Sequence, residues 1–459
     1  MSKAKLIICC DGTACSEYLG DKKSPITNVS RIARAIKKWD EECRQIVLYL
    51  SGIGTDEGNW LNFKNQAIGQ GLESLILEGY MFLSHNWTQQ DEIILIGFSR
   101  GAFAMRCLAD FVIQRGLLSK QALHTLPDEF RHWIKTGHEN RERSGMKIKV
   151  CALWDTVASM GSSFAPENQL GRFSFVHSEL LEDIEYAFQA LSLHERRSHF
   201  APLVWKYRDV DDRVRDNTLD QCWFAGHHGD IGGEGQALSH FALAWIIAKL
   251  RPFVAISEDE VWTRQPLLDA WQIHPGEPLG ILDASRTFLC RAFQKLHRQP
   301  CCHFQNENGQ DHLAERIQHD GSRERMHFSA GLLQHYGAVE RFISFHDFDY
   351  FDPSVERGED FRALQPNDRR SWILAYPGQA NPHARKLFRF LYKDPTLQPI
   401  EDPAYYRVEE QTLGEDEKHV LAAWTQHQHG LLIDEMSAIG SPELKNTYLF
   451  TLRSYLSAL

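Results

Sequence analysis

One short motif, set between an apolar strand and an apolar helix, constrains the fold of this chain most. Residues 97–101 read Gly-Phe-Ser-Arg-Gly and fit the pattern G-x-S-x-G, with the apolar run Ile93–Ile96 before them and the almost wholly apolar stretch Arg100–Gln114 after them. A strand, a tight turn and a buried helix in this order place Ser99 on a strained elbow at the carboxyl edge of a sheet. A Cβ on either glycine would collide with the neighbouring strand or helix. The motif predicts a nucleophilic serine, although a glycine-rich turn in which Ser99 only caps the helix gives the same pattern.

Further apolar runs extend this pattern over the first half of the chain. Most of the runs do not alternate with polar residues, so the strands are expected to be buried on both faces, as in a parallel sheet. Right-handed crossovers between them give a doubly wound, mostly parallel α/β sheet that binds ligands at the carboxyl ends of its strands. The expected strands are Lys5–Cys10, Ile46–Ser51, Glu92–Gly97, Ile148–Leu153 and Gln221–Ala225, and the other expected helices are Asn28–Lys38, Ala67–Leu83 and Ala237–Leu250.

The second half of the chain is less regular. From about Arg251 onward it is richer in His, Gln, Pro and charged residues. We therefore expect a catalytic domain over 1–250 and a helical or irregular extension over 251–459 that acts as a lid or accessory region. Within the extension, Gln299–Arg325 is polar enough for a loop or lid, and Asp416–Leu459 returns to helical periodicity.

Charge, hydropathy and cysteine usage exclude several classes of protein. The 50 Lys and Arg residues are outnumbered by 61 Asp and Glu residues, and the net charge of −11 argues against a dedicated nucleic-acid binder. No run of about 20 apolar residues exists, so no membrane-spanning helix is expected. The apolar run Leu6–Cys10 is too short for a signal peptide. Ten scattered cysteines without a CxxC pair predict reduced thiols and a cytoplasmic location, while the oligomeric state is left open.

A serine nucleophile needs a base and an acid, and both are available in the expected chain order. Asp155 follows the strand Ile148–Leu153, where a triad acid or a simple turn cap would lie. His228 lies in a glycine-rich loop after another strand, and we predict that it is the base, with His227 as its substitute. Asp230 in the same loop either orients the imidazole or braces the loop, and is the rival of Asp155 for the role of acid.

The end of the first strand supplies candidates for an oxyanion hole. The backbone amides of Gly12 and Thr13 are predicted to form one half of the hole and the amide of Arg100 the other half. Asp11 is expected to hold this loop by accepting backbone hydrogen bonds, although an ordinary Asp-Gly turn has the same sequence. No cofactor or metal is expected, because the chain has no P-loop, no dinucleotide-binding glycine motif and no zinc-ligand spacing. We interpret Leu191–His199 as the end of a helix whose Glu195 pairs with neighbouring arginines.

Several of these segments together resemble a largely uncharacterised family of α/β-hydrolase domains. The family occurs in bacteria and fungi, and it includes phospholipase effectors of the type VI secretion system, first lipase class. The resemblance covers roughly residues 1–255 and implies Ser99 as nucleophile, Asp155 as acid and His228 as base. It also implies ester hydrolysis, of phospholipase A type in some members. It rests on Leu6–Thr13, Thr27–Val29, Gly97–Phe103, Trp154–Ala158, Ala190–Arg197 and Trp223–Gly233.

The resulting hypothesis is a serine hydrolase that cleaves a lipid or small-molecule carboxylic ester through an acyl-enzyme. A second hypothesis uses the same triad for acyl transfer, or for forming or opening a lactone of a small metabolite. A third is a hydrolase-fold scaffold without activity. A fourth is a metal-dependent phosphoesterase that uses Asp11, Asp155 and Asp230.

Overall fold

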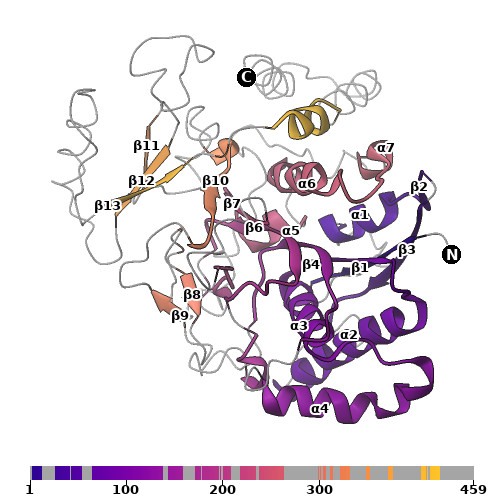
Figure 1. Cartoon of the computed structure of the whole chain (residues 1–459). Helices are drawn as coiled ribbons and strands as arrows, with labels where there is room; N and C mark the ends of the chain where they lie inside the picture. Colours follow the sequence, from indigo (N-terminus) through magenta and orange to yellow (C-terminus); the bar gives the residue numbers. More distant parts are fainter. Residues whose placement is uncertain are drawn as a thin grey trace. The chain divides into compact units, whose positions relative to one another are not determined.

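The structure is a computed structural model, and it falls into two compact units, residues 1–324 and 325–459, which we describe separately (Figure 1). The division expected at residue 250 stays a prediction about where the catalytic domain ends. The residues described are 3–12, 26–41, 43–53, 65–137, 143–158, 171–176, 178–195, 197, 200–207, 218–233, 237–262, 298, 300, 303–305, 311–313, 321–330, 348–351, 371–375, 405–409, 411 and 414–423.

An eight-stranded sheet forms the centre of the first unit, in the order β10-β7-β6-β5-β4-β1-β3-β2. The neighbouring strands β7, β6, β5, β4, β1 and β3 are all parallel, while the short β2 runs antiparallel to β3. The first unit ends within the edge strand β10. The bounds are β1 (Ala4–Cys10), β2 (Trp39–Asp40), β3 (Cys43–Leu50), β4 (Glu92–Phe98), β5 (Ile148–Trp154), β6 (Ile184–Ser192), β7 (Leu219–Phe224) and β10 (Glu324–Met326).

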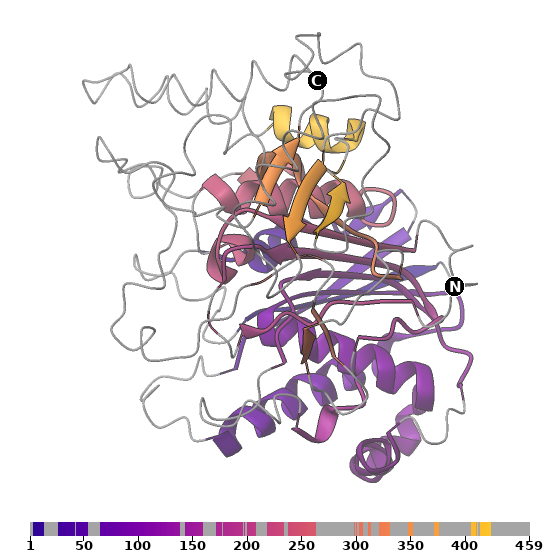
Figure 2. The same cartoon turned by 90° about the vertical axis from the view of Figure 1, so that its left-hand side faces the viewer.

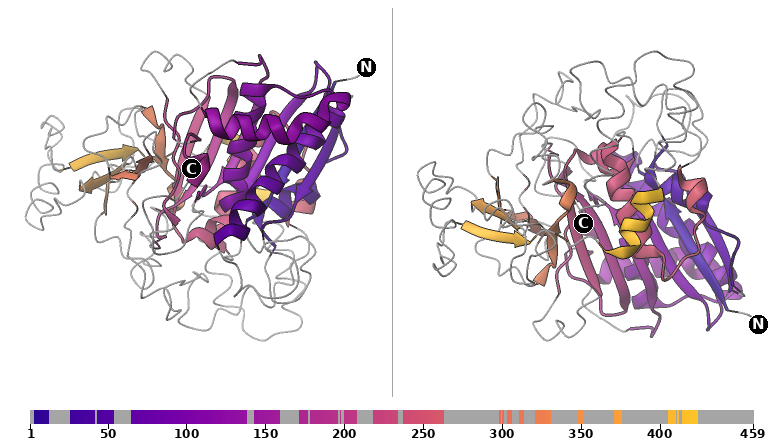
Figure 3. Two further views of the ribbon diagram at one scale, coloured as in Figure 1. Left: turned by 90° about the horizontal axis from the view of Figure 1, so that it is seen from below. Right: turned by 90° about the horizontal axis from the view of Figure 1, so that it is seen from above.

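Helices cover both faces of this sheet, which confirms the predicted doubly wound α/β fold (Figure 2). One face carries α1 (Asn28–Ala35), α6 (Ala237–Leu250) and α7 (Glu258–Trp262). The opposite face carries α2 (Asn65–Asn86), α3 (Ser99–Arg115) and α4 (Leu126–Thr136), as the view from below in Figure 3 shows. Shorter turns of helix are α5 (His228–Gly232), η2 (Lys120–Thr125) and η4 (Gly171–Phe173). Of the helices that the structure describes, none combines the length and the apolar character that a membrane span requires.

The core lies where the apolar runs of the sequence predict it. Leu6–Cys10 in β1 and Ile94–Ile96 in β4 have no exposed surface, as strands buried between two helical layers require. Helix α3 is buried from Gly101 to Gln114, in agreement with its apolar sequence. The interpretation of Leu191–His199 as a helix end is wrong, because β6 extends to Ser192 and pairs with β5 and β7.

The strand order places a topological switch point between β1 and β4. From β1 the chain crosses over α1, on one face, to β3; from β4 it crosses over α3, on the other face, to β5. The loops that leave β1 and β4 therefore diverge at the carboxyl ends of the two strands, which is where doubly wound sheets bind their ligands. Asp11 and Gly12 follow β1 at this point, and Ser99 follows β4.

The described parts of the C-terminal half contain small antiparallel sheets and little helix. In the first unit, β8 (His303–Gln305) pairs with β9 (Asp311–Leu313), within the segment expected to be a loop. In the second unit, β11 (Phe348–Phe351), β12 (Ser371–Ala375) and β13 (Tyr405–Glu409) form a three-stranded sheet. Residues 415–423 are helical, and the rest of the helical segment predicted over Asp416–Leu459 lies outside the described residues.

Candidate active site

Ser99 begins helix α3 directly after β4 and adopts a left-handed backbone conformation, with φ of 58°. A side-chain-bearing residue is strained there and persists only where its surroundings enforce the conformation. The two flanking glycines supply that environment. A Cβ on Gly97 would lie 2.7 Å from the Cα of Ala102, and a Cβ on Gly101 would overlap the carbonyl oxygens of Cys10 and Asp11. The elbow therefore fits only because both positions lack a side chain.

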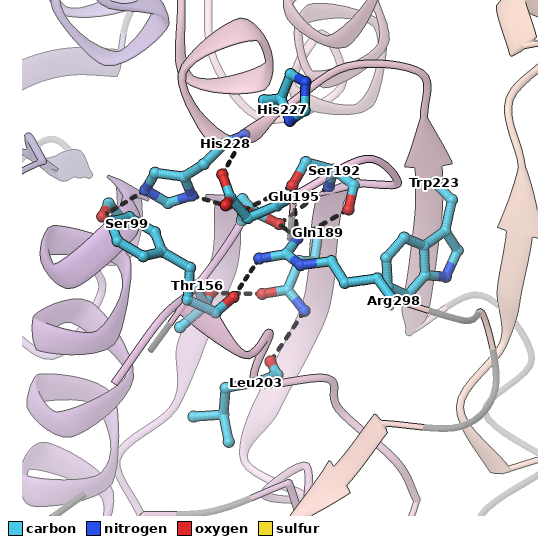
Figure 4. Close-up of polar contacts among 12 residues, drawn as sticks. Ser99, Thr156, Gln189, Ser192, Glu195, Leu203, Trp223, His227, His228 and Arg298 are labelled. Carbon is cyan, nitrogen blue, oxygen red and sulfur yellow. Dashed lines mark hydrogen bonds and ion pairs between the residues drawn. The ribbon is translucent and has the colours of Figure 1, made fainter. Parts of the chain in front are cut away.

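Ser99, His228 and Asp155 form one continuous chain of hydrogen bonds (Figure 4). The Oγ atom of Ser99 lies 2.8 Å from Nε2 of His228, and Nδ1 of His228 lies 2.5 Å from Oδ2 of Asp155. Ser99 follows the carboxyl end of β4, Asp155 that of β5 and His228 that of β7, and each of the three residues is at most 6% exposed. In this geometry the imidazole can accept the serine proton on one nitrogen while the carboxylate holds the other.

Hydrogen bonds from three residues hold the carboxylate of Asp155. Its backbone is also left-handed, with φ of 40°, and the carboxylate accepts hydrogen bonds from the amide and the hydroxyl of Ser192, each at 3.0 Å. Nη1 of Arg298 lies 2.6 Å from Oδ1. Burial alone would raise the pKa of Asp155, but the charge of Arg298 and the hydrogen bond from His228 outweigh it and lower the pKa to about 2. Asp155 is therefore an anion throughout the neutral range.

Two aromatic rings and a second carboxylate surround His228. The rings of Phe98 and Phe200 each have their centroid 4.7 Å from the imidazole. The backbone amide of His228 donates to Glu195 Oε2 at 3.3 Å, and Glu195 also binds the guanidinium of Arg197 at 2.8 Å. Burial opposes ionisation of Glu195, yet the hydrogen bonds and charge of Arg197 keep its pKa well below its usual range. The imidazole is thus fixed in orientation and shielded from bulk water.

The loop after β1 lies against the serine, as an oxyanion hole requires. A Cβ on Gly12 would lie 2.8 Å from Cδ1 of Phe98 and 3.3 Å from the Cβ of Ser99, so a side chain there would force the Phe98 ring or the loop to shift. Asp11 Oδ1 accepts the Gly12 amide at 2.8 Å, and its Oδ2 binds the hydroxyls of Thr27 and Tyr49, each at 2.6 Å. Asp11 therefore holds the loop through one backbone and two side-chain bonds. The amide of Gly12 points at Asp11 in this arrangement, and Thr13 lies outside the described residues.

His227 and Asp230 do not take part in the contact with Ser99. Figure 4 shows the ring of His227 turned away from Ser99, and its backbone amide donates to Asp230 Oδ2 at 2.7 Å. With this bond Asp230 caps the start of α5 and braces the loop, while the Nδ1 atom of His228 is held by Asp155. Of the two roles considered for Asp230, the structure places it in the bracing one.

The three carboxylates of the metal-dependent hypothesis have separate partners in the structure. Asp11 binds Thr27 and Tyr49, Asp155 binds His228, and Asp230 caps α5. Within the described part of the chain, no three His, Cys, Asp or Glu side chains come close enough together to hold a metal ion. Asp11, Asp155 and Asp230 therefore do not converge on one point at which they could share a metal ion.

A buried network of polar side chains next to the site was not predicted from the sequence. Thr156 donates to Gln189 (Figure 4), and the Gln189 amide nitrogen lies 2.9 Å from the amide oxygen of Gln221 on the neighbouring strand. Gln221 in turn donates to the carbonyl of Ser322 at 2.6 Å. The available signal was a glutamine within each of two largely apolar segments, which become paired positions of β6 and β7. Arg298, by contrast, lies 143 residues from Asp155, and no local pattern marks it.

Three comparisons relate the chain to known proteins. The sequence profile of the type VI secretion system (T6SS) phospholipase effector Tle1-like catalytic domain matches residues 4–249. The uncharacterized protein YEL023C of Saccharomyces cerevisiae is 27% identical over 242 residues, which are 44% of this chain and 33% of the yeast protein. A crystal structure of an uncharacterized protein from Pseudomonas aeruginosa aligns with a TM-score of 0.36 and 16% identity over 59% of this chain and 48% of that one. The chain thus spans a third of the yeast relative and about half of the bacterial one.

Proposed function

The chain belongs to the family of type VI secretion system phospholipase effector Tle1-like catalytic domains, and we propose that it is a serine esterase acting on a lipid. The bond cleaved is a carboxylic ester, and the reaction passes through an acyl-enzyme on Ser99. One observation carries this proposal. A serine on a strained elbow lies 2.8 Å from an imidazole whose other nitrogen lies 2.5 Å from a buried carboxylate. This is the geometry of a nucleophile, its base and the group that orients the base.

The first half of the reaction transfers the acyl group to the enzyme. Ser99 Oγ attacks the ester carbonyl carbon while its proton passes to Nε2 of His228. Asp155 stabilises the imidazolium that forms, and the negative charge moves to the former carbonyl oxygen. When the tetrahedral intermediate collapses, the C–O bond to the alcohol breaks, and His228 returns the proton to the departing alkoxide. The products at this stage are a free alcohol and an acylated Ser99.

The second half regenerates the serine with water. His228 takes a proton from a water molecule, whose oxygen attacks the acyl carbon, and the bond to Ser99 Oγ then breaks as the serine recovers its proton. The charge on the carbonyl oxygen develops at the start of α3, where the helix dipole and the amide of Arg100 favour an anion. The amide of Gly12 completes the oxyanion hole if it turns from Asp11 to the substrate oxygen.

The test uses a short p-nitrophenyl ester and the full-length protein. Ser99→Ala should lose at least about 10³-fold in kcat, since removing the nucleophile leaves only binding and the oxyanion hole. A fluorophosphonate probe should label the wild type at Ser99 alone. Ser119→Ala is the matched control, because Ser119 only caps the exposed turn η2. Equal turnover in Ser99→Ala, or labelling at another serine, would remove the proposal.

The ester class is tested with liposomes of a diacyl phospholipid. Release of fatty acid by the wild type and not by Ser99→Ala supports a lipid substrate, which is what the family assignment favours. If only short soluble esters are cleaved, the serine mechanism stands and the substrate becomes a small-molecule ester.

A further inference from the structure

We propose that Arg298 is a positioning residue of the triad, which fixes the carboxylate of Asp155 and keeps the proton affinity of the Asp155–His228 pair low. This inference rests on the proposed function and extends it to a residue beyond the segment 4–249 that the family profile matches. Arg298 belongs to the same compact unit as the triad.

The contacts of Arg298 converge on one carboxylate and its supports. Nη1 lies 2.6 Å from Asp155 Oδ1, 2.8 Å from the carbonyl oxygen of Ser192 and 2.5 Å from its hydroxyl. Nη2 donates to the carbonyl oxygen of Phe200. The side chain has no exposed surface, and Figure 4 shows it on the side of His228 that faces away from Ser99. A guanidinium has the planar, multiple-donor geometry that such a site needs, which an ammonium group lacks.

These bonds fix two of the groups that touch the imidazole. Asp155 holds Nδ1 of His228, and the ring of Phe200 packs edge-on against the imidazole. The guanidinium of Arg298 donates to the carboxylate of Asp155 and to the backbone carbonyl of Phe200. A change at Arg298 therefore reaches His228 along both contacts, although Arg298 itself touches neither His228 nor the serine in any bond described here.

Charge gives Arg298 a second effect. The charged groups around His228 are Asp155 at the end of β5, Glu195 with Arg197 after β6, and Arg298; Asp230, on the same short helix, caps its start. A cation on the far oxygen of Asp155 offsets part of the negative charge that would hold a proton on the imidazole. Without that cation, the Asp155–His228 pair binds its proton more tightly, whichever member carries it. The general base then becomes available only at higher pH.

The kinetic test compares Arg298→Gln and Arg298→Lys in the full-length protein. For Arg298→Gln, the acid limb of the profile of kcat/KM against pH should move to higher pH by about one unit. At pH values below the limb, kcat/KM should be about tenfold lower than in the wild type. KM should change by less than roughly twofold, because Arg298 does not face the substrate. Arg298→Lys should restore the position of the limb but not the full plateau of kcat. Arg115→Gln, which breaks the half-exposed ion pair with Glu129 at 2.6 Å, is the control.

A readout without turnover separates this proposal from the proposed function. In the Ser99→Ala background, the NMR titration of the Asp155–His228 pair, followed at imidazole resonances assigned with His228→Gln, should move to higher pH when Arg298 becomes Gln. If the titration moves although the wild-type protein, with Ser99 in place, hydrolyses no ester, the coupling stands and the proposed function fails. If the enzyme is active but neither the limb nor the titration moves, Arg298 is only a structural residue and the proposal is overturned.

A second substitution, at Asp155, tests whether Arg298→Gln acts only by preventing folding. Arg298→Gln leaves Asp155 as an unpaired buried charge, which can prevent folding. The double variant Asp155→Asn/Arg298→Gln removes both charges and should fold at least as well as Arg298→Gln alone. A double variant that is destabilised by the sum of the two single changes would show that the two residues are not coupled, and would reject the inference.

Discussion

Ser99 and Asp155 share a left-handed backbone conformation at the carboxyl ends of the neighbouring strands β4 and β5, with φ of 58° and 40°. The amide of Val157, two residues after Asp155, donates to the carbonyl of Ser99 at 3.4 Å, so the two turns are also bonded to each other. The proposed nucleophile and the proposed acid thus lie on two strained turns that support one another. Strain of this kind is typical of sites in which the surrounding fold fixes the reacting groups.

Relief of that strain gives a prediction for stability. Ser99→Gly and Ser99→Ala both remove the hydroxyl, but only glycine adopts a φ of 58° without steric cost. We expect Ser99→Gly to be more stable than Ser99→Ala by about 1 kcal/mol in urea denaturation, with both variants inactive. Equal stabilities of the two variants would contradict the elbow conformation.

Loss of the acid should affect stability and turnover together. Asp155→Asn leaves the fully buried Arg298 without its anionic partner, which costs about 3 kcal/mol of unfolding free energy. The same change removes the group that orients His228, and kcat should fall by about 10³- to 10⁴-fold. Chemical denaturation and steady-state kinetics measure the two effects, and Asp128→Asn, which breaks only the exposed ion pair with Arg131, serves as the control.

The low pKa of Asp155 predicts acid sensitivity. Its pKa falls from 3.8 to about 2 on folding, so the folded state binds the proton more weakly than the unfolded state does. The resulting stabilisation is fully present above about pH 4 and is lost as the pH falls toward 2. This difference in pKa corresponds to a stabilisation of roughly 2 kcal/mol. Glu195, whose pKa is also lowered, adds to the loss in the same direction. Urea midpoints between pH 7 and pH 2 should therefore decline less steeply in Asp155→Asn than in the wild type.

Packing around the second glycine of the motif gives a steric prediction. A Cβ on Gly101 meets two backbone carbonyls, which cannot move aside as a flexible side chain would. Gly101→Ala should cost about 3 kcal/mol and displace the loop at Asp11 from the serine. Gly321→Ala, where a Cβ meets no atom within 4 Å, is the matched change that should cost little. Thermal unfolding of Gly101→Ala and Gly321→Ala measures the two stability losses, and equal losses would contradict the steric argument.

Local sequence was sufficient for the parts of the fold that depend on local patterns. The apolar run of β4, the glycines around Ser99 and the apolar helix α3 are contiguous, so their signals reinforce each other. Helix α6 was predicted over its full length, Ala237–Leu250, because it is apolar on all sides. These are the elements that form the centre of the sheet and its covering layer.

Partners distant in the sequence were not predictable from it. Strand β6 was missed because Gln189 interrupts its apolar run and charged residues follow it closely. Its glutamine is tolerated in the core because Gln221 on the next strand satisfies the amide. Arg298 acquires its role only when the folded chain brings it to Asp155. The roles assigned to Ser99, Asp155 and His228 remain predictions until the kinetic tests are made.

The distance along the chain between the triad and Arg298 has a consequence during synthesis. His228 is translated about 70 residues before Arg298, which at roughly 5–20 residues per second is an interval of about 4–14 s. Throughout that interval, the nascent chain holds Ser99, Asp155 and His228 but lacks the arginine that pairs with Asp155. The proposed active site is therefore expected to mature late, after the ribosome has released the segment that carries the arginine.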